Sequence, residues 1–283
     1  MLDIILETVI DTLKLIPFLF LAFLLIEYIE HKLKEKNKKV ITKSKFSVFF
    51  GSLLGLVPQC GFSVLATNLY VTRVVSLGTL ISIYLSTSDE MLPLFIANKV
   101  DFTFILKVLL IKFLVGFISG IIIDLLIRKK SELDCHICSD DDCHCDSNIF
   151  KSAFVHTFKI ILFLLMISFL LNLSFEYFGF DLISKLFMKG TIFEVFLSSL
   201  VGLIPNCGSS VVITELYMNN ILSFGGLISG VLTGSGVAIL VLFKTNKKLL
   251  ENLKILGIVY AIGVIVGLIL NLFVWQKLIN ILL

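Results

Sequence analysis

Apolar residues run along this chain in long blocks that are separated by short polar stretches. The blocks cover residues 9–29, 46–57, 61–72, 76–97 and 102–127 in the first half, and 155–175, 191–204, 208–217, 221–243 and 253–275 in the second. About 20 helical residues are needed to cross the roughly 30 Å hydrocarbon core of a bilayer. The longer blocks therefore predict transmembrane helices, whereas 46–57 and 61–72 are each too short to cross alone.

The two halves of the chain repeat one another at a constant offset of 147 residues. The sequence GLVPQCGFSV from Gly55 to Val64 returns as GLIPNCGSSV from Gly202 to Val211. Duplicated apolar segments that are interrupted by glycine and proline are typical of secondary transporters. We therefore predict an all-α polytopic membrane protein that is built from two five-segment repeats.

The short blocks on either side of each Pro-x-Cys-Gly turn form either one broken span or a re-entrant hairpin. With hairpins, most lysines and arginines fall on one side of the membrane, as the positive-inside rule requires, whereas broken spans weaken this asymmetry. The hairpin interpretation is favoured. Each half then crosses the membrane an odd number of times, so the two repeats are predicted to be inverted, with both turns lining a shared central site.

The two turns are the first candidate substrate site. Proline removes a backbone donor and glycine permits unusual dihedrals, so main-chain carbonyls become available to a ligand beside Gln59 and Cys60, and beside Asn206 and Cys207. The alternative is that these small residues only allow helices to pack closely.

Ionisable and amide residues within the apolar blocks extend this candidate site. Asp89 and Glu90 lie inside block 76–97, where an acid costs about 2.5 to 3.5 kcal/mol and needs a cation or a proton as partner. The alternative is that both acids cap a helix at an aqueous surface. Asn68 and Glu215 occupy equivalent positions in the two repeats and add oxygen ligands, although Glu215 could equally be a solvated residue at the interface.

The connection between the halves is rich in metal-ligating side chains. It carries four cysteines and two histidines within eleven residues, at Cys135, His136, Cys138, Cys143, His144 and Cys145. Such tracts bind soft or borderline metals, although the spacing is too compressed for an ordinary zinc finger, and an acidic solvated linker is the alternative. The predicted organisation is a first repeat over 1–130, a cytoplasmic linker over 131–150 and a second repeat over 151–283.

Composition agrees with a membrane protein and excludes several classes. The chain is 57% hydrophobic and 16% charged, and its mean hydropathy is +1.02, so its apolar surface must face a lipid bilayer. No nucleotide-binding or nucleic-acid-binding pattern is present, and no catalytic geometry can be argued, so we expect no enzyme. The first block carries Asp3, Glu7 and Asp11, which predicts a retained helix and not a cleaved signal peptide.

The combination of these motifs resembles the ten-helix heavy-metal exporter family, whose members are also described as arsenic efflux proteins or manganese transporters. The resemblance rests on IEYIEH at 26–31, the PQCG and PNCG turns, TSDE at 87–90 and the central Cys/His linker. It implies a multi-pass protein of the cell (cytoplasmic) membrane that exports a metal or metalloid, with the family motif at Cys60, Asp89, Glu90 and Cys207.

The leading hypothesis is a secondary transporter with a midplane site between inverted repeats. It would export a heavy metal or metalloid, such as manganese or an arsenical, from the cytoplasm, with proton coupling through Asp89, Glu90 or Glu215. The transported or linker-bound metal ion is the only ligand that is expected, with no separate cofactor. The alternatives are a membrane-bound metal sensor or chaperone, and a membrane thiol oxidoreductase that uses Cys60 and Cys207.

Overall fold

The computed structural model describes residues 45–57, 60–88, 90–126 and 191–282, together with Phe187 and isolated positions within 16–24 and 154–169. Every regular element in this part is an α-helix, as the sequence predicts. The first repeat contains α2 (Lys45–Gly55), α3 (Cys60–Val71), α4 (Leu77–Ser86), α5 (Met91–Ala97) and α6 (Phe102–Leu126), and the second contains α8 (Ile192–Gly202), α9 (Cys207–Met218), α10 (Phe224–Thr233), α11 (Ala238–Thr245) and α12 (Leu249–Leu282).

The helices have the length and surface of a polytopic membrane protein. Among the described residues, four helical stretches are long and apolar enough to cross a bilayer, at Leu77–Ala97, Phe102–Leu126, Phe224–Thr245 and Leu249–Leu272. On α6 one stripe of large apolar side chains is exposed, at Phe102, Leu106, Leu110, Leu114, Ile118, Ile122 and Leu125. Successive residues of this stripe are three or four positions apart and so are neighbours on the helix surface, where they would contact lipid.

Two of these stretches are broken, and the first break agrees with the alternative in which Asp89 and Glu90 precede a new helix. Blocks 76–97 and 221–243 were expected to be full spans. Instead α4 ends at Ser86 before α5 begins at Met91, and α10 ends at Thr233 before α11 begins at Ala238. In the second break Gly236 has a φ of 55°, a backbone conformation that favours glycine.

The helices of the two repeats correspond one to one, because each helix of the second repeat begins 147 residues after its counterpart. The local contacts that set the helix ends are repeated too. Ser76 caps α4 by accepting from the backbone N–H of Thr79, and Ser223 caps α10 by accepting from that of Gly226. Both are side-chain N-caps of the kind that satisfies an otherwise unpaired N–H group.

Close helix packing in each repeat depends on glycine. In the first repeat α4 packs against α2 and α6, and in the second α10 packs against α8 and α12. A Cβ atom added at Gly78 would clash with the main chain of Gly120 on α6, and one added at Gly225 would clash with that of Gly267 on α12. Small residues let the backbones approach in this way within membranes.

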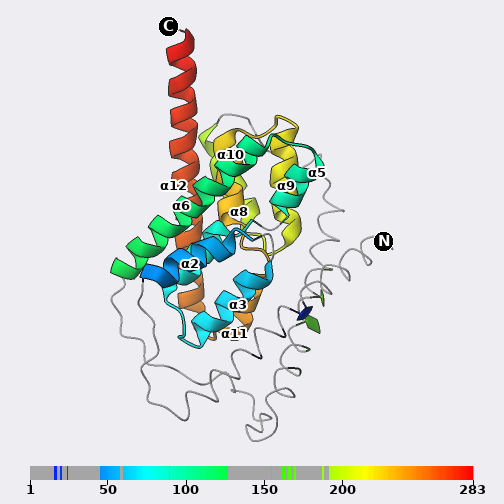
Figure 1. The fold of residues 1–283 in the computed structure, drawn as a ribbon, viewed down its shortest axis with the longest axis vertical. Coiled ribbons are helices and arrows are strands. Elements are labelled where there is room, and N and C mark those ends of the chain that lie inside the picture. The colour runs from blue at the N-terminus through cyan, green and yellow to red at the C-terminus, as the bar shows by residue number, and fades with distance from the viewer. Residues whose placement is uncertain are drawn as a thin grey trace, which may run out of the picture.

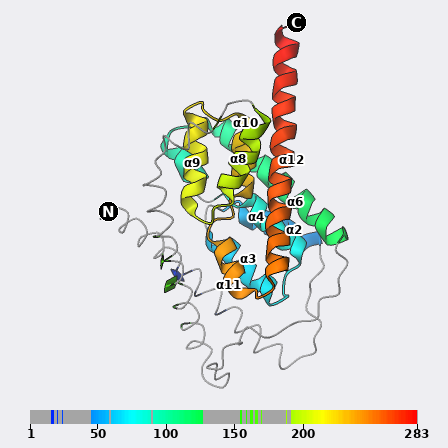
Figure 2. The same ribbon diagram turned by 180° about the vertical axis from the view of Figure 1, so that it is seen from behind.

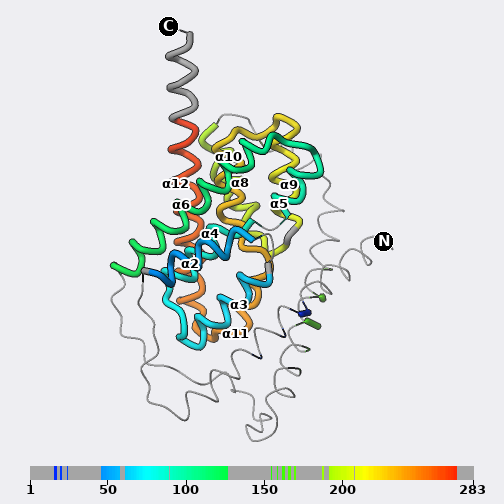
Figure 3. Tube along the Cα trace, in the orientation of Figure 1, coloured from blue at the N-terminus to red at the C-terminus, as the bar shows by residue number. Residues whose placement is uncertain are grey.

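The two repeats contact each other through equivalent pairs of helices. The α3 helix of the first repeat packs against α11 of the second, and α9 of the second packs against α5 of the first. The first pair lies at one end of the described helices and the second pair at the opposite end (Figures 1, 2 and 3). Between the two ends α4 packs against α10.

Equivalent tyrosines contact the opposite repeat at these two ends. Tyr217 on α9 stacks on Phe104 near the start of α6, with ring centroids 5.6 Å apart and an interplanar angle of 8°. Tyr70 on α3 instead donates a hydrogen bond to the carboxylate of Glu251 near the start of α12. The equivalent contact is therefore an aromatic stack at one end of the described helices and a hydrogen bond to a carboxylate at the other.

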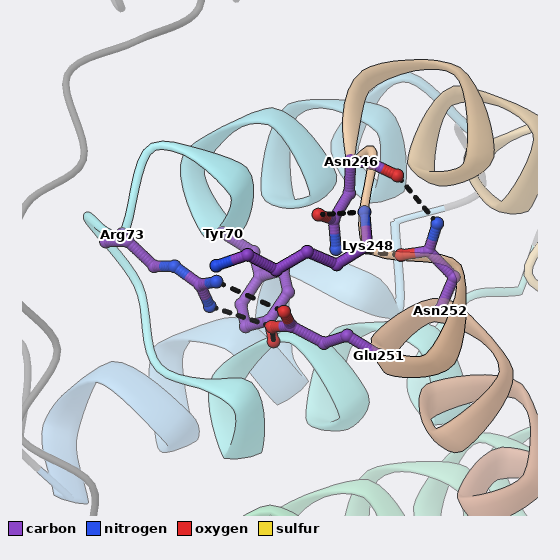
Figure 4. Close-up of polar contacts among 6 residues, drawn as sticks. All are labelled: Tyr70, Arg73, Asn246, Lys248, Glu251 and Asn252. Atoms are coloured by element: carbon purple, nitrogen blue, oxygen red, sulfur yellow. Dashed lines mark hydrogen bonds and ion pairs between the residues drawn. The ribbon is translucent and has the colours of Figure 1, made fainter.

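Arg73 completes the charged contact (Figure 4). Its two terminal nitrogens donate to the two carboxylate oxygens of Glu251, over 2.8 Å and 3.2 Å, and its guanidinium lies 5.2 Å from the centre of the Tyr70 ring. The hydrogen bonds to Glu251 raise the pKa of Arg73 above its ordinary value. Arg73 has a φ of 62°, and its counterpart Asn220 has a φ of 59°, so the same loop conformation serves both repeats.

Gly78→Ala should destabilise the protein by about 1–3 kcal/mol, because the added methyl group overpacks the contact between α4 and α6. Gly225→Ala should act alike. Gly257→Ala is the matched control, since a Cβ there meets no atom within 4 Å. It should be neutral or stabilising by about 0.5–1 kcal/mol. Thermal unfolding in detergent measures both, and equal midpoints for Gly78→Ala and the wild type would contradict the packing argument.

Arg73→Asn and Glu251→Gln should each lower the unfolding midpoint, and the double variant should lose little more than either single one. Asparagine tolerates the left-handed backbone at position 73, and glutamine retains an acceptor for Tyr70. The expected coupling is about 0.5–1 kcal/mol, because the pair is partly solvent-exposed, and it should shrink in high salt. Strict additivity of the two single effects would show that the ion pair contributes nothing.

Candidate functional site

The candidate site lies where the two broken helices approach each other. At the first break Thr87 and Ser88 are almost fully buried, and at the second break Thr233 and Ser235 are completely buried. A break in a helix leaves carbonyl groups without their usual i+4 donors. At membrane depth such groups are tolerated only where protein or a water-filled cavity surrounds them.

Lys112 of α6 joins the two broken helices. Its side chain is 1% exposed, and its ammonium donates to the carbonyl oxygen of Thr87 and, over 2.6 Å, to that of Val231 in the last turn of α10. One carbonyl therefore comes from each repeat. The C-terminal end of a helix carries partial negative charge, so both helix ends favour a cation at this point.

The opposite ends of α4 and α10 carry the complementary charge. Asp124 of α6 accepts from Ser76 Oγ over 2.6 Å and from the N–H of Gly78 over 2.9 Å. In the second repeat Asn271 takes the equivalent bonds from Ser223 and Gly225, while the fully buried Glu194 accepts from the N–H of Ser223. Each half-helix therefore has a carboxylate at its N-terminal end, where the helix dipole favours one.

The helices that precede the two Pro-x-Cys-Gly motifs, α2 and α8, end beside the two breaks. Gly55 at the end of α2 approaches the side chain of Ser86, and Gly202 at the end of α8 approaches Gly230 and Thr233. In the second turn Asn206 is 6% exposed and its carbonyl accepts from Ser209 Oγ over 2.8 Å. Gln59 and the side chains of Cys60 and Cys207 lie outside the described residues, so their proposed role stays a prediction.

Asn68 of α3 is the most unusual polar residue in the described part of the chain. Its side chain is 1% exposed, yet neither its amide nitrogen nor its amide oxygen has a hydrogen-bond partner among the described residues. Leaving a buried polar group unpaired costs roughly 1–3 kcal/mol. Such a group in a folded protein needs a reason, and a binding role is one.

A hydroxyl pair lies one residue away from Asn68. Thr67 Oγ1 donates to the carbonyl of Ser63 over 2.7 Å and lies 2.6 Å from the Tyr84 hydroxyl of α4. Tyr84 in turn reaches the carbonyl of Ala238 at the start of α11, over 3.5 Å. These contacts connect α3 through α4 of the same repeat to the start of α11 in the second repeat, directly after the second break.

The predicted acids do not form a single described cluster. Glu90 is partly exposed and precedes α5, whereas Glu215 is partly buried on α9. Asn68 lies on α3 and Glu215 on α9, and these two helices lie at opposite ends of the described helices (Figure 1). Within the described residues, no group of three or more His, Cys, Asp or Glu side chains could hold a metal ion. Asp89 and the linker cysteines and histidines lie outside those residues.

The sequence interpretation missed three charged residues, namely Lys112 and Glu194, which are buried, and Asp124, which is partly buried. The sequence could have shown two of them, because Lys112 and Asp124 are charged residues within an otherwise strongly apolar helix of 25 residues. Ionisable residues within membrane spans are costly and face the interior of a helical bundle.

The chain was compared with protein families, curated proteins and solved structures. The family model described as "Putative, 10TM heavy-metal exporter" matches residues 1–186 and 165–281, which together cover almost the whole chain. No curated protein matches, and no solved structure matches. The family match agrees with the broken, apolar helices and the buried polar centre, and this membrane protein therefore belongs to the 10TM heavy-metal exporter family.

Proposed function

We propose that this protein is a secondary transporter that exports a heavy metal or metalloid from the cytoplasm through a site between two inverted repeats. The cargo would be a divalent cation such as manganese, or an arsenical. The family match supports the export of a heavy metal, and the buried, unpaired amide of Asn68 supports a binding site inside the helical bundle.

The position of the helix breaks supports a site near the middle of the membrane. Thr87 lies near the centre of Leu77–Ala97, and Lys112 lies near the centre of Phe102–Leu126. Broken helices at this depth place polar main-chain groups where no solvent would otherwise reach them. Transporters bind substrates and coupling ions with such groups.

The exchanged contacts between the repeats support the inverted arrangement. Helix α3 contacts α11, and the equivalent helix α9 contacts α5. Such reciprocal pairing is what a pseudo-two-fold axis produces. When that axis lies in the plane of the membrane, the two repeats can rock against each other and open the central site to each side in turn.

The remaining candidate residues complete this proposal. Asp89 and Glu90 lie in the sequence between α4 and α5 and would provide carboxylates for the cargo or for a coupling proton, with Glu215 as a further acid on α9. Gln59, Cys60, Asn206 and Cys207 would bind from the two turns. The linker at 135–145 would collect metal on the cytoplasmic side of the cell membrane.

The main experiment measures uptake into inside-out vesicles of manganese, zinc, cadmium, cobalt and arsenite, with and without a pH gradient. Asn68→Leu should abolish or strongly reduce uptake while raising the unfolding midpoint, because leucine removes the unpaired amide without leaving a cavity. Asp89→Asn should also abolish uptake.

Asn98→Ala is the control, since Asn98 is exposed at the end of α5. It should leave uptake unchanged. A stabilised Asn68→Leu variant that transports like the wild type would remove Asn68 from the path. Absence of flux for every species in the wild type would overturn the proposed function.

Deletion of residues 135–145 should lower the apparent affinity for metal without abolishing transport, because the linker would supply cargo but not carry it across. Initial uptake rates over a range of metal concentrations measure this effect. Unchanged affinity would make the linker passive, and tight metal binding by the linker in a protein without flux would favour a sensor or chaperone.

A further inference from the structure

The ammonium of Lys112 occupies a position where two main-chain carbonyls from different repeats converge. The Lys112 ammonium donates to the carbonyl oxygen of Thr87 at the first break and to that of Val231 at the end of α10. Both carbonyls belong to C-terminal helix ends, whose partial charge is negative. A convergence of carbonyl oxygens at two negative helix ends is the arrangement that binds a hard cation.

We propose that Lys112 is a tethered cation that fills a cation site between α4 and α10, and that a cationic cargo must displace its ammonium in order to bind there. This inference rests on the proposed transport function and names the substrate class of the same site. The ammonium keeps its proton throughout. It moves on its flexible four-carbon stem, and the cation takes over the carbonyls that it leaves.

The difference between the repeats supports this role over a purely structural one. The position equivalent to Lys112 is Val259 on α12, which is 1% exposed. The repeated scaffold therefore packs with an apolar side chain at this position. A charge in the middle of a membrane span is costly, and the repeated scaffold does not need one at this position, so the lysine points to a role beyond packing.

The same geometry selects the sign of the cargo. An anion placed between Thr87 and Val231 would face two carbonyl oxygens and two negative helix ends. A cation would instead gain from these carbonyl oxygens and helix ends. Carbonyl and carboxylate oxygens suit hard divalent cations such as Mn²⁺. The site therefore favours a metal cation over an arsenical oxyanion.

The test compares binding of radioactive Mn²⁺ by the purified full-length wild type, Lys112→Met and Lys107→Met in detergent. Methionine has nearly the length of lysine without the charge. Lys107 lies on the same helix but is exposed, so its replacement is the matched control. All three proteins carry the same linker, so its contribution cancels. Arsenite and arsenate are measured in parallel.

Lys112→Met should bind Mn²⁺ at least about tenfold more tightly than the wild type, because the competing charged donor is gone, while Lys107→Met should be unchanged. Equal Mn²⁺ affinity in a folded Lys112→Met variant would overturn the proposal. Loss of arsenate binding without a gain for Mn²⁺ would also overturn it, since Lys112 would then be an anion ligand.

Should Lys112→Met fail to purify as a monodisperse protein, Mn²⁺ added during solubilisation should restore it, because a free cation can replace the tethered one. Failure of this rescue would contradict the proposal. The binding readout is separate from flux. Tighter Mn²⁺ binding by Lys112→Met would support the cation site even if the wild type moved no metal, which would overturn the transport function alone.

Discussion

The structure depends on one constraint, which is that main-chain polar groups inside a membrane must find partners within the protein. Helices α4 and α10 both end partway through the bundle, and their last carbonyls would be unpaired there. Lys112 satisfies one carbonyl from each repeat. A single buried ammonium thus makes the two broken helices compatible with each other and with the membrane.

Around that centre the duplicated scaffold distinguishes the residues that both repeats share from those in which they differ. Serine caps and glycine contacts recur at equivalent positions in both repeats, because both must fold the same unit. The polar residues that differ are more informative. Asn68 in the first repeat is replaced by Glu215 at the equivalent position of the second, and Lys112 is replaced by Val259. Under the proposed function only one set of ligands is needed, so the chain could diverge at these positions without losing its fold.

The two ends of the helical bundle illustrate the same divergence. Tyr70 hydrogen bonds to Glu251, whereas the equivalent Tyr217 stacks on Phe104. An ion pair is weakened by water and salt, whereas an aromatic stack gains from burial. The interfaces between the repeats thus use different physical interactions at the two ends, although the tyrosines that make them are equivalent.

The sequence by itself determined the helical class, the membrane environment and the duplication, because hydropathy and a constant repeat offset are local, one-dimensional properties. It also marked Asn68 and the cysteine turns as candidates. Only the tertiary structure decided that α4 and α10 are broken, that Lys112 lies between them and that Asn68 has no described partner. Those features depend on which helix ends meet in space, and apolar periodicity carries no information about that.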